Sequence, residues 1–235
     1  MIPIQDQNPT SRKAYVNWTL IIINIVVFLY SILIVSFEQF LCTYGLKPSQ
    51  ITGLSPVVQG PCEQLGLFQN AGYQTFLTSM FLHGGLLHIG GNMLYLWIFG
   101  DNIEDLTGHP GYIIFYLASG VAASLAHIAS DPSSLVPAVG ASGAISGVLG
   151  AYLVRFPHAR VRAIVFIGRF GQLIRLPAFL LIGFWFLYQL LLSLIDTTGG
   201  VAYFAHIGGF IAGLLFAFAI PKKKPPQQPA QGPYP

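Results

Sequence analysis

The sequence predicts an all-α protein that crosses a membrane several times as one bundle of six helices. Hydrophobic residues make up 54% of the 235 residues and charged residues only 8%, whereas roughly 25% of the residues in a soluble domain are charged. In addition, four apolar stretches approach or exceed the ~20 residues that a helix needs to span a bilayer. Both observations indicate a polytopic membrane bundle.

The six helices are expected, in order, at residues 14–37, 86–103, 111–129, 142–154, 176–195 and 201–220. The second is long enough to span but carries His88 and Asn92, and the fourth is too short to span alone. The first is too long for a cleaved signal peptide and no small-residue cleavage site follows it. Residues 1–13 are expected to form a cytoplasmic segment, 14–220 the six-helix domain, and 221–235 a disordered, basic and proline-rich tail.

Basic residues predict the orientation. They gather before the first helix, between the fourth and the fifth, and after the sixth: Arg12, Lys13, Arg155, Arg160, Arg162, Arg169, Arg175, Lys222, Lys223 and Lys224. Six crossings place all of them on one side, so we expect both termini in the cytoplasm and the chain in the cell inner (plasma) membrane. The net charge of +3 requires no nucleic-acid partner, since anionic lipid attracts basic residues at this face.

The two longest connections differ in character. Residues 38–82 form a long outer loop, apolar enough to lie partly in the membrane interface. Residues 156–176 are punctuated by arginines, so we expect an inner interfacial segment, and no strand is expected anywhere in the chain. Cys42 and Cys62 both lie in the outer loop, where a disulfide and two free thiols are equally open.

The short fourth helix predicts a polar pit in the membrane. A helix over 142–154 is about 20 Å long at 1.5 Å per residue, whereas the hydrocarbon core is ~30 Å thick. Because Arg155 marks the cytoplasmic end, Ser142 is expected roughly 10 Å below the outer surface. The preceding loop must dip to meet it, and irregular backbone at this depth has to be buried in protein or line a watery cavity. A broken helix of this kind is typical of functional sites.

Two other helices carry polar residues to the same depth. His88 and Asn92 are four residues apart and share one helix face, and His206 lies near the start of the last helix. Ionisable residues within spans face the bundle interior or a cavity. Small residues allow the fourth and sixth helices to approach closely: Gly143, Gly147 and Ala151 on one, and Ala205, Gly209 and Gly213 on the other. His206 is therefore expected at the level of Ser142.

These residue types indicate acyl transfer. Ser142 would be the nucleophile and His206 its general base, in a dyad, because no aspartate is placed to orient the imidazole. The Ser142 N–H at a helix N-terminus, the Asn92 amide and the His88 imidazole would stabilise the oxyanion. Gly140, in the same loop as the serine, is added to the residues expected to bind the oxyanion or the substrate.

Each residue also has a purely structural interpretation. Ser142 could belong to a small-residue packing face, and His206 could be a hydrogen bond between helices; their joint occurrence at one depth disfavours both. No cysteine or carboxylate joins the histidines on the outer side, so we expect neither a metal nor a cofactor. His83 is expected to anchor the outer loop. The remaining polar candidates are expected to be solvated or capping: His109, His127, His158, Asp101, Glu104 and Asp105.

Three stretches carry a resemblance: "TSMFLHGGLLHIGGNMLYLWIFGDNIED", "VGASGAISGVLGAY" and "AHIGGFIAG". With them, the chain resembles the bacterial rhomboid intramembrane serine proteases over about residues 14–220. The resemblance implies that Ser142 is the nucleophile, His206 the base, and His88 with Asn92 the oxyanion site.

The resemblance also implies a structural role for Glu104 and a lateral gate in the helix over 176–195, at Phe184, Trp185 and Phe186. Two features depart from the family. Gln74 and Thr75 stand where many members have Trp-Arg, and Ser146 replaces an aromatic residue that stacks on the catalytic histidine. Ser146 is expected to offer a hydrogen bond instead.

The sequence therefore predicts a serine endopeptidase that cleaves single-span transmembrane proteins near the outer membrane face, in contact with lipid. One alternative is a catalytically inactive rhomboid-like protein that binds membrane clients. It is disfavoured because all four site residues are present. A small transporter is the other, and it is disfavoured because the helices show no inverted repeat and no acidic residue at mid-membrane.

Overall fold

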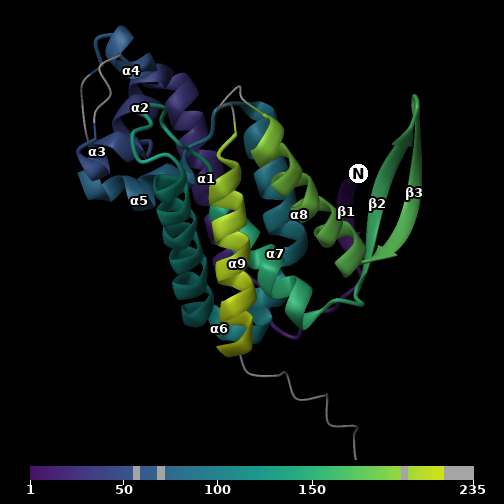
Figure 1. Ribbon diagram of the computed structural model, residues 1–235. Coiled ribbons are helices and arrows are strands. Elements are labelled where there is room, and N and C mark those ends of the chain that lie inside the picture. Colours follow the sequence, from purple (N-terminus) through teal and green to yellow (C-terminus); the bar gives the residue numbers. More distant parts are fainter. Residues whose placement is uncertain (55–58, 68–71, 197–200, 220–235) are drawn as a thin grey trace, which may run out of the picture.

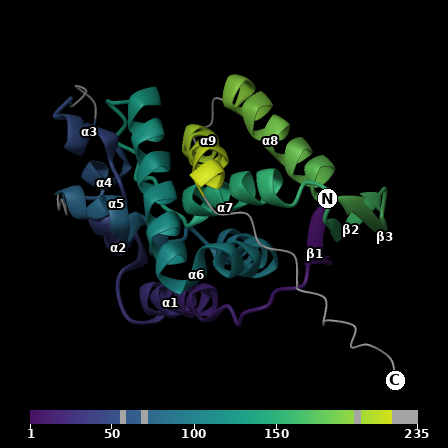
Figure 2. The same ribbon diagram turned by 90° about the horizontal axis from the view of Figure 1, so that it is seen from below.

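The structure, a computed structural model, describes residues 1–54, 59–67, 72–196 and 201–219. The predicted tail at 221–235 lies outside the described residues. Five helices form the body of the molecule: α1 (Tyr15–Leu33), α6 (Leu86–Ser130), α7 (Ser142–Arg155), α8 (Ala178–Ile195) and α9 (Tyr203–Ala219). Figure 2 shows α7 and α9 side by side in the centre, between α6 and α8.

The helix α6 contains both of the ranges predicted as the second and third helices. It bends at Gly108, whose backbone leaves the helical region at φ 71° and ψ 167°. Glycine adopts this conformation without the steric cost that other residues incur. By length and apolar composition, three helices in the described part of the chain are able to cross a membrane, namely α1, α6 and α8. The apolar helix α9 is slightly shorter.

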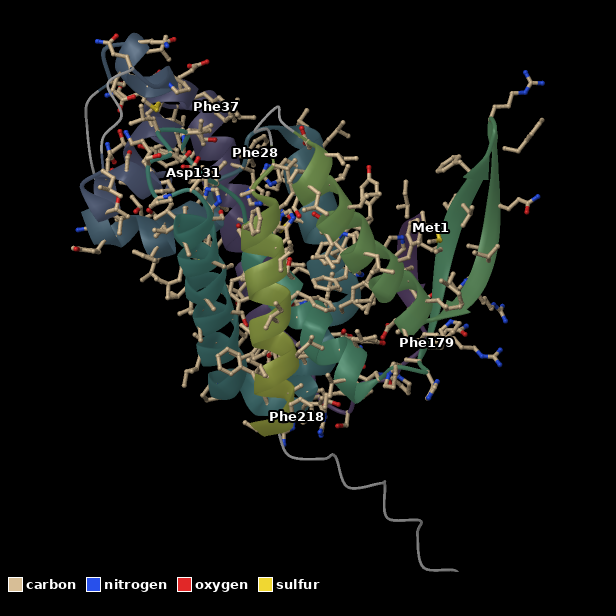
Figure 3. The ribbon with its side chains drawn as sticks, viewed as in Figure 1. Met1, Phe28, Phe37, Asp131, Phe179 and Phe218 are labelled. Atoms are coloured by element: carbon tan, nitrogen blue, oxygen red, sulfur yellow. A yellow bond between two sulfur atoms is a disulfide. The ribbon has the colours of Figure 1, made fainter. Side chains whose placement is uncertain are left out.

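The outward faces of these helices are apolar. Figure 3 shows Phe179 on α8 and Phe218 on α9 projecting away from the bundle, and the side chain of Phe218 is 78% exposed. Monomeric soluble proteins rarely leave large contiguous apolar surfaces uncovered. The exposed apolar helices therefore indicate a multi-pass membrane protein.

The prediction that the chain has no strands is wrong. Three strands form an antiparallel sheet in the order β1-β2-β3 beside α8: β1 (Ile2–Asp6), β2 (Arg160–Ile167) and β3 (Phe170–Pro177) (Figure 1). Residues 156–176 are thus mainly a hairpin, and the N-terminal segment is its third strand. Asp6 accepts hydrogen bonds from Tyr152 of α7 and Asn102 of α6, and its burial raises the pKa of its carboxyl group. These bonds attach the sheet to the bundle.

The helices α7 and α9 approach so closely that their glycines cannot carry side chains. A Cβ atom on Gly209 would lie 2.0 Å from the carbonyl oxygen of Gly143, and one on Gly213 would lie 1.9 Å from that of Gly147. On its other side, Gly147 lies against Ser119 of α6. The close approach predicted from the small residues is therefore confirmed.

Two carboxylates at the bend of α6 hold the start of α1. Glu104, almost fully buried, accepts hydrogen bonds from the N–H groups of Val16 and Asn17 at 3.0 and 2.7 Å. Asp105 accepts from the backbone of Ser11 and Arg12. A carboxylate at a helix N-terminus satisfies free N–H groups and complements the helix dipole. The structural role expected for Glu104 is confirmed.

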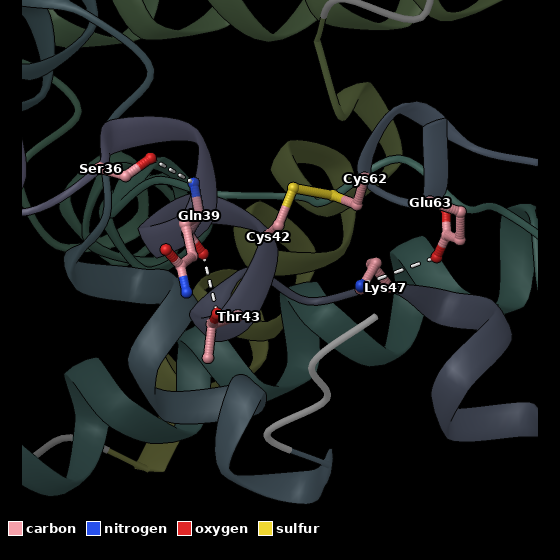
Figure 4. Close-up of a disulfide and its surroundings, with 7 residues drawn as sticks. All are labelled: Ser36, Gln39, Cys42, Thr43, Lys47, Cys62 and Glu63. Atoms are coloured by element: carbon pink, nitrogen blue, oxygen red, sulfur yellow. Dashed lines mark hydrogen bonds and ion pairs between the residues drawn. A yellow bond between two sulfur atoms is a disulfide. The ribbon is translucent and has the colours of Figure 1, made fainter. Parts of the chain in front are cut away.

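A set of short helices covers one end of the bundle (Figure 1): α2 (Phe37–Tyr44), α3 (Pro48–Thr52), α4 (Pro61–Gln64), η1 (Gly72–Gln74), α5 (Thr75–Thr78) and η2 (Ser79–Phe81). Cys42 and Cys62 form a disulfide between α2 and α4, with Cα atoms 5.7 Å apart (Figure 4). Beside it, Lys47 lies 3.9 Å from Glu63. The question that the sequence left open is answered in favour of the disulfide.

The same group of short helices also holds the segment that leads to Ser142. The backbones of Leu46 and Ala138 exchange two hydrogen bonds, at 3.0 and 2.8 Å, and the N–H of Ser49 donates to the carbonyl of Ser134. Thr78 anchors the end of the loop, because its hydroxyl donates to the carbonyl of Tyr44 at 2.7 Å. The loop therefore fixes the backbone on which the candidate nucleophile depends.

Candidate active site

Ser142 is the first residue of α7. The first N–H groups of a helix have no partner within it and lie at the positive end of the helix dipole. The small neighbours explain this position: Gly140 supplies an unusual backbone conformation, and Gly143 lies against Ala123 of α6, where a Cβ atom would come within 2.6 Å. The fold thus presents a serine hydroxyl beside free backbone donors.

The imidazole of His206 lies next to this hydroxyl. His206 Nε2 is 2.8 Å from Ser142 Oγ, and its Nδ1 is 2.7 Å from Oε1 of Gln189 on α8. The ring of Trp185, also on α8, lies 6.1 Å from the imidazole, centre to centre. His206 is therefore held from three sides, although an aspartate is not among its partners.

Two further groups line the space in front of Ser142. The N–H of Gly84 donates to Nδ1 of His88 at 3.2 Å, so in the neutral ring Nε2 carries the hydrogen and is a donor. Asn92 is 8% exposed, and its Nδ2 atom has no hydrogen-bond partner within the described part of the chain. Buried amide donors are normally paired. An unpaired donor in a cavity is suited to bind a developing negative charge.

Gly140 was expected to bind the oxyanion or the substrate, but its N–H is not free to bind an oxyanion. Its N–H donates to the carbonyl oxygen of Ser79 at 2.9 Å, so this hydrogen is already used. Its φ angle is +129°, a conformation that L side chains rarely adopt. A Cβ atom here would lie 2.7 Å from His88 Nε2 and 3.4 Å from Ser142 Oγ. Gly140 therefore keeps open the space between the two side chains.

These residues share a cavity of about 850 Å³. Its lining comes from the start of α6, from α7, α8 and α9, and includes His88, Asn92, Ser142, Trp185 and His206. A second cavity, of about 430 Å³, lies between α6 and α8 and shares Tyr95 and Trp185 with the first. Trp185 thus lies between the site and the outward face of α8.

Ser146 does not bond His206. Its hydroxyl donates to the carbonyl of Ser142 at 2.6 Å, and its side chain is fully buried. The hydrogen bond that the sequence suggested for Ser146 is therefore wrong, and Gln189 and Trp185 hold the imidazole instead. The sequence contained a clue to Gln189, because it is the one residue with an amide side chain in the apolar range 176–195.

The other histidines are distributed as follows. His158 is exposed, as expected. His109 bonds the carboxylate of Glu104 and keeps 43% of its side chain exposed, and His127 is half-buried, so these two are only partly solvated. His83 is buried, with its ring edge-on to that of His88 at 5.2 Å. Among the described residues, no three His, Cys, Asp or Glu side chains are grouped as a metal site requires.

Comparison with known proteins gives the family. The model of the Rhomboid domain matches residues 70–223, which include every residue of the site. The chain belongs to the rhomboid family. Membership supports an intramembrane protease function.

Three rhomboid relatives illustrate the similarity. Rhomboid protein 1, mitochondrial, of Saccharomyces cerevisiae is 33% identical over 63% of this chain and 42% of its own length. Rhomboid protease GluP of Bacillus subtilis is 32% identical over 72% of this chain and 30% of its own length. The human presenilin-associated rhomboid-like protein, mitochondrial, is 34% identical over 40% of this chain and 25% of its own length. The chain thus spans less than half the length of these relatives.

Proposed function

We propose that this protein is an intramembrane serine endopeptidase that cleaves transmembrane proteins by acyl transfer. The observation that carries the proposal is the 2.8 Å contact between Ser142 Oγ and His206 Nε2, in a cavity lined by His88 and Asn92. A catalytically inactive client-binding protein would not need a serine, a base and unpaired donors in one place. Membership in the rhomboid family supports the same conclusion.

In the first step, Ser142 Oγ attacks the carbonyl carbon of the scissile peptide bond and transfers its proton to His206 Nε2. Negative charge then develops on the carbonyl oxygen. The N–H of Ser142, the Nδ2 of Asn92 and the Nε2–H of His88 are the donors that stabilise this oxyanion. The apolar residues around the cavity lower the local dielectric constant, so these bonds are stronger than they would be in bulk solvent.

The tetrahedral intermediate collapses when His206 returns its proton to the leaving amine, and the amine departs. Ser142 is then acylated. A water molecule loses a proton to the same imidazole and attacks the ester, which releases the second product and restores the free hydroxyl. The mechanism uses no metal and no cofactor.

The proposal includes a placement in the membrane. The six crossings are α1, the two arms of α6, α7, α8 and α9, within a catalytic domain at 14–220. Both termini are proposed to lie in the cytoplasm, which the distribution of basic residues supports, and the chain is proposed to lie in the cell inner membrane. Because α7 has 14 residues, about 21 Å at 1.5 Å per residue, Ser142 lies recessed from the outer face and the cut falls near that face.

Single-span proteins are the proposed substrates, because one helix can enter from the lipid between α6 and α8. The second cavity supports this route, because it shares Tyr95 and Trp185 with the site cavity. The proposed gate is therefore the middle of α8, at Phe184, Trp185 and Phe186, with Trp185 as the side chain that lines the site cavity.

The test uses purified protein in liposomes with a panel of single-span substrates, and product masses are read by mass spectrometry. We expect cleavage at one peptide bond near the outer end of a substrate helix, and none with Ser142→Ala or His206→Ala. Binding of the substrates without any cleavage by the wild type would favour the inactive client-binding alternative.

A further inference from the structure

The proposed dyad leaves one hydrogen-bond contact of the site unexplained, the one between Gln189 and His206. Gln189 lies on α8 and is only 7% exposed, although its neighbours in this helix are mostly apolar. Its Oε1 atom is 2.7 Å from His206 Nδ1. Burying a primary amide costs free energy unless it is hydrogen-bonded. This side chain therefore has a specific partner rather than a general packing role.

We propose that Gln189 is a positioning residue that keeps His206 in the tautomer required of a general base, an inference that rests on the proposed protease function. For Ser142 to lose its proton to Nε2, that nitrogen must be unprotonated and Nδ1 must carry the hydrogen. Oε1 of Gln189 accepts this hydrogen. The opposite tautomer would place Nε2–H against the serine hydroxyl, so Nε2 could not accept its proton, and with the amide in its observed orientation two acceptor atoms would face each other at Nδ1.

The position of the amide is suited to the membrane. A carboxylate in the same place would orient the imidazole and also stabilise its protonated form, but a charge within a membrane span is costly. An amide oxygen keeps the orientation at no cost in net charge. We therefore expect a smaller catalytic contribution than that of the aspartate in a Ser-His-Asp triad, where the wrong tautomer lowers kcat about 10⁴-fold.

The helix that supplies Gln189 is the one beside the proposed substrate route. Four residues of α8 are buried, and three of them, Ala178, Leu181 and Ile182, lie in its first turns. The fourth is Gln189. Between them, Trp185 and Phe186 place their rings against Phe210 of α9. The orientation of the base thus depends on α8 lying against α9 at this level.

The experiment compares Gln189→Leu, Gln189→Glu and a control, Ser193→Ala, in the full-length protein. Leucine keeps most of the volume but accepts no hydrogen bond, whereas glutamate accepts one. Ser193 is one turn further along the same helix, and within the described residues its hydroxyl bonds the carbonyl of Leu190. We expect kcat to fall roughly 10- to 100-fold in Gln189→Leu, with KM little changed, below the ~10⁴-fold limit set by the triad. Gln189→Glu should recover part of the rate, and Ser193→Ala should match the wild type.

The tautomer itself is read from nitrogen-15 spectra of ring-labelled histidine, with the His206 signals assigned from their loss in His206→Ala. We expect the hydrogen on Nδ1 in the wild type and a redistribution toward Nε2 in Gln189→Leu. An unchanged tautomer or an unchanged kcat in Gln189→Leu overturns the inference. If the wild type cleaves no substrate, but the hydrogen still moves from Nδ1 toward Nε2 in Gln189→Leu, the protease proposal is contradicted and the positioning role is supported.

Discussion

At the scale of single residues, the site depends on which nitrogen of each imidazole carries its hydrogen. His88 accepts from Gly84 at Nδ1, so its Nε2–H is a donor toward the cavity. His206 has the opposite requirement, since its Nε2 faces the Ser142 hydroxyl and its Nδ1 faces an amide oxygen. Two histidines in one cavity thus take opposite roles, one as donor and one as acceptor.

Replacing Asn92 tests the proposed oxyanion site. Asn92→Ala removes an unpaired donor, so we expect kcat to fall roughly 10- to 1,000-fold, with the thermal unfolding midpoint little changed. Asn24→Ala is the matched control, because Asn24 is a buried amide on α1 that bonds the carbonyl of Leu20. Steady-state cleavage of one substrate by the three proteins is the measurement. Equal losses in both variants would exclude a special role for Asn92.

The pH dependence tests the base. An imidazolium ion cannot accept the serine proton, so kcat should fall on the acidic side as His206 becomes protonated. The unperturbed pKa of a histidine is about 6.5. Initial rates measured from about pH 8 to about pH 4 should therefore follow a single protonation. A rate that stays constant over this range would remove His206 from the role of base.

Sequence reasoning predicted that Ser142, His206, His88 and Asn92 lie together, because each is a polar residue in an apolar stretch, and the structure brings all four into one cavity. Sequence reasoning did not find Gln189. A lone amide in an apolar helix has no partner in the sequence, and its direction depends on how far α8 is rotated about its axis. The same limit applies to Ser146, whose hydroxyl bonds its own helix.

At the scale of helices and strands, the packing of α7 on α9 determines whether Ser142 and His206 meet. Gly143, Gly147 and Gly150 of α7 lie against the backbone or small side chains of the neighbouring helices. In the absence of Cβ atoms, the two helix axes approach closely. The distance between Ser142 Oγ and His206 Nε2 therefore depends on the separation of the two helix axes.

Gly213→Ala tests this packing. The new methyl group would lie 1.9 Å from the carbonyl oxygen of Gly147, so the helices must separate, and overpacking of this kind typically costs ~1–3 kcal/mol. We expect a lower unfolding midpoint in detergent and a lower cleavage rate. Gly183→Ala, on α8, is the control, because nothing lies within 4 Å of its added methyl group. Comparable losses in both variants would contradict the account.

Loosening α8 tests the lateral route. Trp185 touches His206 as well as Phe210, so Trp185→Ala changes the gate and the base together. The ring of Phe186 stacks on Phe210 at 4.1 Å. Phe186→Ala should therefore raise kcat/KM for transmembrane substrates relative to short soluble peptides. The ratio of the two values is the measurement, and an unchanged ratio would remove α8 from the access route.

The sheet shows why some elements escaped prediction. Arginines in the segment 156–176 suggested an interfacial position, yet Val161 and Ala163 are buried and alternate with Arg160 and Arg162. This period of two is typical of a strand, and Gly168 supplies the turn with φ 61°. The third strand, β1, comes from the distant N-terminus, and no local sequence pattern predicts its pairing with β2.

At the scale of the whole molecule, the apolar bundle encloses a small polar site. Buried carboxylates hold α1 to α6 at the end that bears the sheet. At the other end, a disulfide-linked loop holds the backbone before Ser142. The site lies between these two supports, and its cavity shares Tyr95 and Trp185 with a second cavity between α6 and α8. This arrangement is the physical basis of the proteolysis that we propose.

The most direct test of the central claim is to map the adduct of a fluorophosphonate, which reacts with activated serines. Ser142 and Ser146 are one turn apart on α7, but only Ser142 contacts His206. We predict an adduct on Ser142, identified by peptide mass spectrometry, that is retained in Ser146→Ala and abolished together with cleavage in Ser142→Ala. Labelling that persists in Ser142→Ala and disappears only when Ser146 is also replaced would contradict the account.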